Sequence, residues 1–131
     1  MTIGITSLDH VNVTVPPDRE EEAKKFYENV LGLKRVDKPA GSRQSMGAWY
    51  QLEHCQIHLS VEESAQQLSE RHFCVKVAAI DAAQQQFRDA GIEMIPDERP
   101  IAGRSRFYVR DPGGNLIEVA QDDRRPATDD R

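Results

Sequence analysis

One order of local sequence patterns occurs twice in this chain of 131 residues. Each time, a strand with alternating apolar and polar residues is followed by an amphipathic helix and then by three short strand segments. The first copy spans about residues 6–61 and the second about 72–121, and the polar segment 62–71 connects them. The sequence therefore predicts an α+β fold of two tandem βαβββ modules, within one domain of residues 1–121.

Turn and helix-stop signals divide each module. The expected strands are 8–15, 33–38, 48–53, 56–61, 72–77, 92–95, 105–110 and 115–121. The first helix is expected to start at a capping box of Asp18 and Glu21, and the second at Asp81 with Gln84. Gly32 and Gly91 are expected to stop these two helices. The second helix should direct Ala83, Phe87 and Ala90 toward the core. The tail 122–131 has no apolar residue larger than Ala, and we expect it to be flexible.

Four potential metal ligands fall at equivalent places in the two modules. His10 and His72 begin corresponding first strands, 62 positions apart, and His58 and Glu118 lie in corresponding last strands, 60 positions apart. The three histidines lie on the polar faces of their strands, whereas Glu118 shares a less polar face with neighbouring apolar residues. If the two halves curve toward each other, these four side chains meet in one cavity.

A single histidine on a strand is more often a hydrogen-bonded structural residue than a ligand. Four such residues at matching positions of a repeat favour a metal site, because a cavity lined by three imidazoles has no evident structural purpose. Three imidazoles and one carboxylate suit one divalent ion of Zn, Ni, Co, Mn or Fe, and suit Ca or Mg poorly. A domain of this size folds without a metal, so such an ion is expected to be functional.

Composition excludes several other classes. The net charge is −5 and no Lys/Arg cluster is present, which argues against nucleic-acid binding. No apolar run approaches the ~20 residues that span a bilayer, and the N-terminus lacks a signal-peptide pattern. Two isolated cysteines, Cys55 and Cys74, suit a reducing cytoplasmic setting.

Two further groups of side chains are open to two interpretations. The aromatic residues Trp49, Tyr50 and Tyr108 fit core or rim positions better than a role in clamping substrate. Three arginines, Arg104, Arg106 and Arg110, fit a solvated surface, with binding of an anionic substrate as the alternative.

Four segments carry a family resemblance: LDHVNVTV with EEEAKKFYENVLGLK, then QIHLSVE, then RHFCVKV with AAQQQFRDAGI, and finally FYVRDPGGNLIEVAQ. Together they resemble the vicinal oxygen chelate superfamily, which includes glyoxalase I, extradiol dioxygenases, and fosfomycin- and bleomycin-resistance proteins. The resemblance covers about residues 6–121. It implies that the two modules form a half-barrel around a metal cavity, usually within a homodimer. Family ligand positions map onto His10, His58, His72 and Glu118.

The resemblance also implies a chemistry. Glyoxalase I is the nearest in ligand pattern, which implies a metal-dependent lyase or isomerase that chelates adjacent oxygens of a small-molecule substrate and stabilises an enediolate-like intermediate. Glyoxalase I has a second glutamate where this chain has His58, so either Glu118 or an imidazole must move the proton, or the reaction is different. Of these, Glu118 is the expected catalytic base as well as a ligand. An extradiol-type ring-cleaving dioxygenase and a metal-free drug-binding protein remain alternatives. The modules could pair within one chain or across two.

Overall fold

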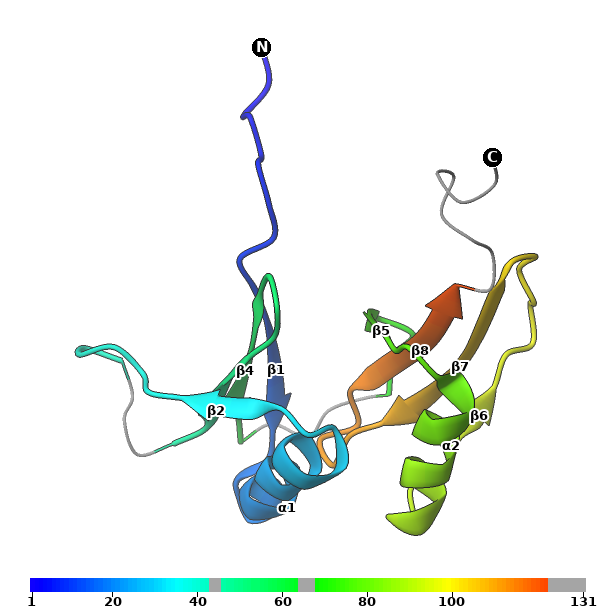
Figure 1. Cartoon of the computed structure of the whole chain (residues 1–131). Coiled ribbons are helices and arrows are strands. Elements are labelled where there is room, and N and C mark those ends of the chain that lie inside the picture. Colours follow the sequence, from blue (N-terminus) through cyan, green and yellow to red (C-terminus); the bar gives the residue numbers. More distant parts are fainter. Residues whose placement is uncertain (43–45, 64–67, 123–131) are drawn as a thin grey trace. The chain divides into compact units, whose positions relative to one another are not determined.

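The computed structural model of the chain describes residues 1–42, 46–63 and 68–122 (Figure 1). The chain divides into two compact units, residues 1–66 and 67–131. Each unit contains one four-stranded mixed sheet and one helical segment, in the order βαβββ, which confirms the predicted fold class. The predicted tail lies outside the described residues from 123 onward, as do residues 64–67 of the predicted connection.

In the first unit, the strands are β1 (His10–Val15), β2 (Lys34–Val36), β3 (Ala48–Gln51) and β4 (Gln56–Val61). They form an open sheet in the order β1-β4-β3-β2, in which β1 and β4 are parallel and the other pairs are antiparallel. The apolar face of β1 and β4 is buried, as the alternation predicts. The core of this unit consists of Val13, Val15, Ala23, Phe26, Tyr27, Ala48, Tyr50, Ile57 and Leu59.

The helical segment of the first unit is not a uniform α-helix. It starts with the 3₁₀ turn η1 (Pro17–Arg19), continues as α1 (Glu20–Lys25) and ends as the π-helical η2 (Phe26–Val30). The predicted capping box is wrong, because no side chain caps this segment. Pro17 already occupies the first turn, so Asp18 lies inside η1 rather than at the N-cap. The predicted stop is confirmed by Gly32, whose φ of +72° is left-handed.

The second unit repeats this topology. Its elements are β5 (His72–Lys76), α2 (Ile80–Asp89), β6 (Ile95–Pro96), β7 (Arg104–Arg110) and β8 (Leu116–Asp122). The strand order is β5-β8-β7-β6, and β5 and β8 are parallel. The Phe87 ring of α2 is buried and packs edge-on against Phe107 of the sheet, with 5.7 Å between ring centroids.

Two predictions about α2 are wrong. Its N-terminus is capped from β8, because the backbone N–H of Ile80 donates to Gln121 Oε1 at 2.7 Å. Asp81 lies in the first turn of the helix instead of at the N-cap. Ala90 is exposed rather than in the core. Among the described residues, no helix combines the length and apolar character needed to cross a membrane.

Candidate functional site

The first pair of candidate ligands lies on the polar face of β1 and β4. The register of these parallel strands sets Asn12 opposite His58, and His10 lies two residues earlier on the same face of β1. The rings of His10 and His58 stack with a centroid distance of 4.0 Å and an interplanar angle of 17°. The structure therefore brings the two predicted ligands of the first unit into direct contact.

Neighbouring side chains hold these two rings. Trp49 stacks on His58 with 3.8 Å between centroids, His58 Nε2 lies 2.8 Å from Gln56 Oε1, and His10 Nδ1 lies 2.8 Å from an Asp9 carboxylate oxygen. His58 is only 7% exposed. Burial and the nearby His10 lower the pKa of His58, so its ring is neutral near pH 7, the form that binds metals.

The second pair lies on β5 and β8 with the same offset. Cys74 is in register with Glu118, and His72 lies two residues earlier on β5. His72 Nε2 is 3.1 Å from Glu118 Oε1, and His72 Nδ1 is 2.9 Å from the carbonyl oxygen of Glu70. Because a carbonyl oxygen only accepts, Nδ1 carries a hydrogen. In a neutral ring, Nε2 then directs its lone pair at a carboxylate oxygen.

Glu118 is a buried carboxylate with an incomplete set of partners. Its side chain is 6% exposed, and Oε2 has no hydrogen-bond partner in the described part of the chain. The nearest cationic atoms, Nη1 of Arg104 and Nη1 of Arg106, lie 3.6 and 3.7 Å from Oε2, beyond hydrogen-bond distance. A buried oxygen left in this state costs about 1–3 kcal/mol, which a bound cation would recover.

Each unit thus unites two of the four predicted ligands. Within residues 1–42, 46–63 and 68–122, no group of three or more His, Cys, Asp or Glu side chains is close enough to hold a metal ion. The described structure therefore shows the candidate ligands as two separate pairs, His10–His58 and His72–Glu118.

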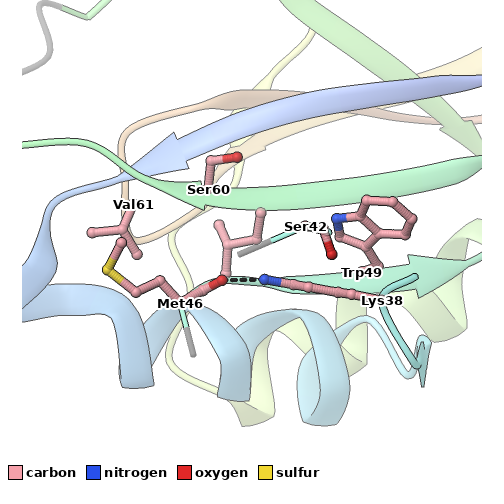
Figure 2. A pocket seen from close by; sticks show the side chains of 7 residues that line it. Lys38, Ser42, Met46, Trp49, Ser60 and Val61 are labelled. Carbon is pink, nitrogen blue, oxygen red and sulfur yellow. Dashed lines mark hydrogen bonds between the residues drawn. The ribbon is translucent and has the colours of Figure 1, made fainter. Parts of the chain in front are cut away.

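Two cavities adjoin these pairs, one in each unit. In the first unit, a cavity of about 240 Å³ is lined in part by Trp49 (Figure 2), the residue that stacks on His58. Figure 2 shows Lys38 donating a hydrogen bond across this cavity to the carbonyl oxygen of Met46. Burial, followed by the charge of Lys24, lowers the pKa of Lys38. In the second unit, a cavity of about 410 Å³ is lined in part by His72, a volume within the range of ligand pockets.

Some residues of the site were not identified as such from sequence. Trp49 was interpreted as a core or rim residue, yet it forms one side of the His58 stack. Arg104 and Arg106 were interpreted as solvated, yet they flank Glu118. Their spacing of two places them with Tyr108 on one face of β7, and this periodicity is the signal that could have identified them.

Comparisons with known proteins agree with this architecture. A protein of the glyoxalase family from Bacillus anthracis is 36% identical, with a TM-score of 0.82 over 93% of this chain and 99% of that one. An integron cassette protein from the mobile metagenome of V. cholerae is 30% identical, with a TM-score of 0.69 over 92% and 98%.

More distant structures share the fold. The fosfomycin resistance protein FosX from Listeria monocytogenes, in a mutant form complexed with Mn(II) and 1S,2S-dihydroxypropylphosphonic acid, is 17% identical, with a TM-score of 0.77 over 90% of this chain and 93% of that one. At this identity, the likeness concerns the fold. A search of curated proteins found no match.

A family model matches most of the sequence. The matched segment, residues 7–119, begins just before β1 and ends inside β8, so it includes both ligand pairs. The chain belongs to the Glyoxalase/Bleomycin resistance protein/Dioxygenase superfamily.

Proposed function

We propose that this chain is a divalent-metal-dependent lyase or isomerase of the glyoxalase type, acting on a small molecule with two adjacent oxygens. One observation supports the proposal: in the His72–Glu118 pair, an imidazole and a buried carboxylate, both common ligands of divalent ions, lie side by side. Its Nε2 and Oε1 atoms face each other at 3.1 Å, and Oε2 of the same buried carboxylate has no hydrogen-bond partner within the described residues. A cation bound by both side chains would provide a partner for His72 Nε2 and for Oε1 and Oε2 of Glu118.

The proposed ligands of this ion are His10, His58, His72 and Glu118. The contact of His72 Nδ1 with a backbone carbonyl is the support that metal-binding histidines ordinarily have, because it fixes the tautomer and the ring orientation. The two pairs share the same strand offset, which supports a common role. Three imidazoles and a carboxylate favour Zn, Ni, Co, Mn or Fe.

In this proposal, the ion supplies Lewis acidity to two adjacent substrate oxygens and so stabilises negative charge that develops when a proton leaves carbon. Glu118 is the proposed base, because it is the one carboxylate of the ligand set. Nη1 of Arg104 and Nη1 of Arg106 lie 3.6 and 3.7 Å from its Oε2, within ion-pair distance. His10 and Trp49 hold the His58 ring between them, which fixes its direction.

Metal analysis of the full chain, purified without a histidine tag, tests the proposal. We expect one divalent ion per chain, and a loss of at least about tenfold in metal affinity in His10→Ala and Glu118→Gln variants. His54→Ala is the matched control, because the His54 side chain is 88% exposed and lies outside both pairs. A chain that takes up no stoichiometric ion on titration would refute the enzyme proposal and leave a metal-free binding protein.

The reaction is then tested with the metal-loaded protein. A panel of hemithioacetals, racemic acyl-CoA thioesters and catechols separates the candidate chemistries. Turnover of the first or second class supports the proposal, whereas oxygen-dependent cleavage of catechols with Fe(II) would replace it by the dioxygenase alternative.

Oligomeric state is measured on the same samples. We expect a homodimer. If the ligand pairs of one site come from two chains, dilution should release metal and abolish activity together; if they come from one chain, both should persist.

A further inference from the structure

The cavity beside His72 contains an arginine that the metal proposal does not use. Arg110, at the end of β7, is in register with Leu116 of β8, and Leu116 is in register with His72 of β5. All three residues line the cavity of about 410 Å³. Because neighbouring strands lie ~4.8 Å apart, the Cα atoms of Arg110 and His72 are separated by ~10 Å, and both side chains belong to the same face of the sheet.

The Arg110 guanidinium is held in place by backbone groups. Its Nη1 donates to the carbonyl oxygen of Gly114 at 2.8 Å and its Nη2 to that of Ser69 at 3.2 Å. The turn that carries Gly114 is itself fixed, since buried Asp111 accepts hydrogen bonds from the backbone N–H groups of Gly113 and Asn115, each at 2.9 Å. The guanidinium is therefore positioned in advance of any ligand.

The charge of Arg110 is not neutralised in the described part of the chain. No carboxylate there lies within ion-pair distance, and the two carbonyl contacts occupy two of the five N–H groups of the half-buried guanidinium. Nε and one hydrogen on each terminal nitrogen remain available. This planar arrangement matches two oxygens of a carboxylate, phosphate or phosphonate.

The other charged residues of the cavity differ from Arg110. Arg106 is already committed, because its Nε donates to Asp97 Oδ2 at 2.9 Å and its Nη2 to the carbonyl oxygen of Arg99 at 2.8 Å. Glu70, Glu98 and Arg99 also line the cavity but are exposed at its edge, where solvent screens their charges.

We propose that Arg110 binds an oxyanion group of the substrate. The substrate is then a small anion whose charged group lies across the sheet from the His72–Glu118 pair. This inference rests on the proposed function, because that proposal makes the cavity beside His72 a substrate site. It adds the class of substrate, a carboxylate or a phosphate- or phosphonate-bearing molecule, and names Arg110 as the residue that selects it.

The test uses the full-length, metal-free chain, so that it does not depend on metal binding. Acetate and methylphosphonate are titrated separately while the Nε–Hε signals of the arginines are followed by NMR. We expect saturable shifts of the Arg110 signal, and affinity reduced about tenfold or more in Arg110→Gln, equivalent to ~1.4 kcal/mol. Arg88→Gln on α2 is the control and should bind as the parent does. A stronger response to one probe identifies the oxyanion type.

Two further variants test the same proposal. Arg110→Lys keeps the positive charge but loses the planar guanidinium, so this variant should fold and bind the anions with intermediate affinity. It provides the decisive measurement if Arg110→Gln unfolds. Glu70→Gln should leave the affinity nearly unchanged, because solvent screens this exposed carboxylate. If Arg110→Gln folds and binds both anions as the parent does, or if neither anion shifts the Arg110 signal, the inference is wrong, and metal analysis of the parent remains a separate result.

Discussion

Replacing Gly47 with Ala should damage the strand pair that carries His58 far more than the same change at Gly32. Both glycines have left-handed backbone conformations, with φ of +73° and +72°. They differ in surroundings. A Cβ at position 47 would lie 2.0 Å from the carbonyl oxygen of Leu59 on β4, whereas a Cβ at position 32 has nothing within 4 Å. The pair therefore separates steric conflict from backbone strain.

The magnitudes follow from these two terms. Each substitution places an alanine in the left-handed region at a cost of about 1–2 kcal/mol. At position 47, the strands must also separate by more than 1 Å at the clash, which adds about 1–3 kcal/mol of overpacking. The hydrogen bond from the Gly47 N–H to Glu20 Oε2, now 2.7 Å long, would weaken as well, at about 1 kcal/mol. We expect losses of about 3–6 kcal/mol for Gly47→Ala and about 1–2 kcal/mol for Gly32→Ala.

Urea unfolding followed by tryptophan fluorescence measures this difference. Trp49 is the only tryptophan of the sequence and stacks on His58, so its emission reports the unit in which both glycines lie. With a slope of about 2 kcal/mol/M, the two variants should differ in midpoint by about 1–2 M. Equal midpoints would show that β4 yields to the new methyl group at little cost, and the rigid placement of His58 argued above would fail.

Two other predictions concern side-chain hydrogen bonds. Burial alone would raise the pKa of Glu28, but hydrogen bonds from Arg35 and Tyr50 outweigh burial and lower this pKa. The Glu28 carboxylate therefore stabilises the fold fully above its ordinary pKa of 4.5, and this stabilisation is lost as the pH falls through the lowered pKa. Glu28→Gln should cost about 1–2 kcal/mol at pH 7 and flatten the acid side of a stability–pH curve; an unchanged curve would contradict it. Gln121→Ala removes the acceptor for the Ile80 N–H and should cost about 1 kcal/mol by thermal unfolding, with Gln121→Glu retaining most of the stability; equal losses in both variants would exclude the cap.

Local patterns were sufficient to predict the order of the elements along the chain. Alternation over 56–61 predicted the bounds of β4 correctly, and Gly32 and Gly91 end the two helical segments as expected. These signals depend on neighbours along the chain. The cap of α2 does not, because Gln121 lies 41 positions from Ile80 and reaches it only after β8 has paired with β5. No local motif could have indicated it.

The candidate site was likewise only partly predictable from local sequence patterns. The repeat placed four candidate ligands at equivalent positions, and the structure brings them together as two pairs with the same strand offset. Trp49 could not be assigned from alternation, because its contact with His58 depends on the register between β3 and β4. The approach of Arg104 to Glu118 likewise depends on pairing between β7 and β8.

The difference between the two pairs bears on which substrates the proposed site would accept. The His10–His58 pair is uncharged when both rings are neutral, so Glu118 contributes the only negative charge of the proposed ligand set. A divalent ion held by these four residues would keep a net charge of about +1, whereas a set with a carboxylate in place of His58 would leave it near zero. A residual positive charge strengthens the binding of an anionic oxygen. The presence of His58 and the position of Arg110 in the cavity wall therefore favour the same class of substrate through separate charges, one at the ion and one ~10 Å across the sheet from His72.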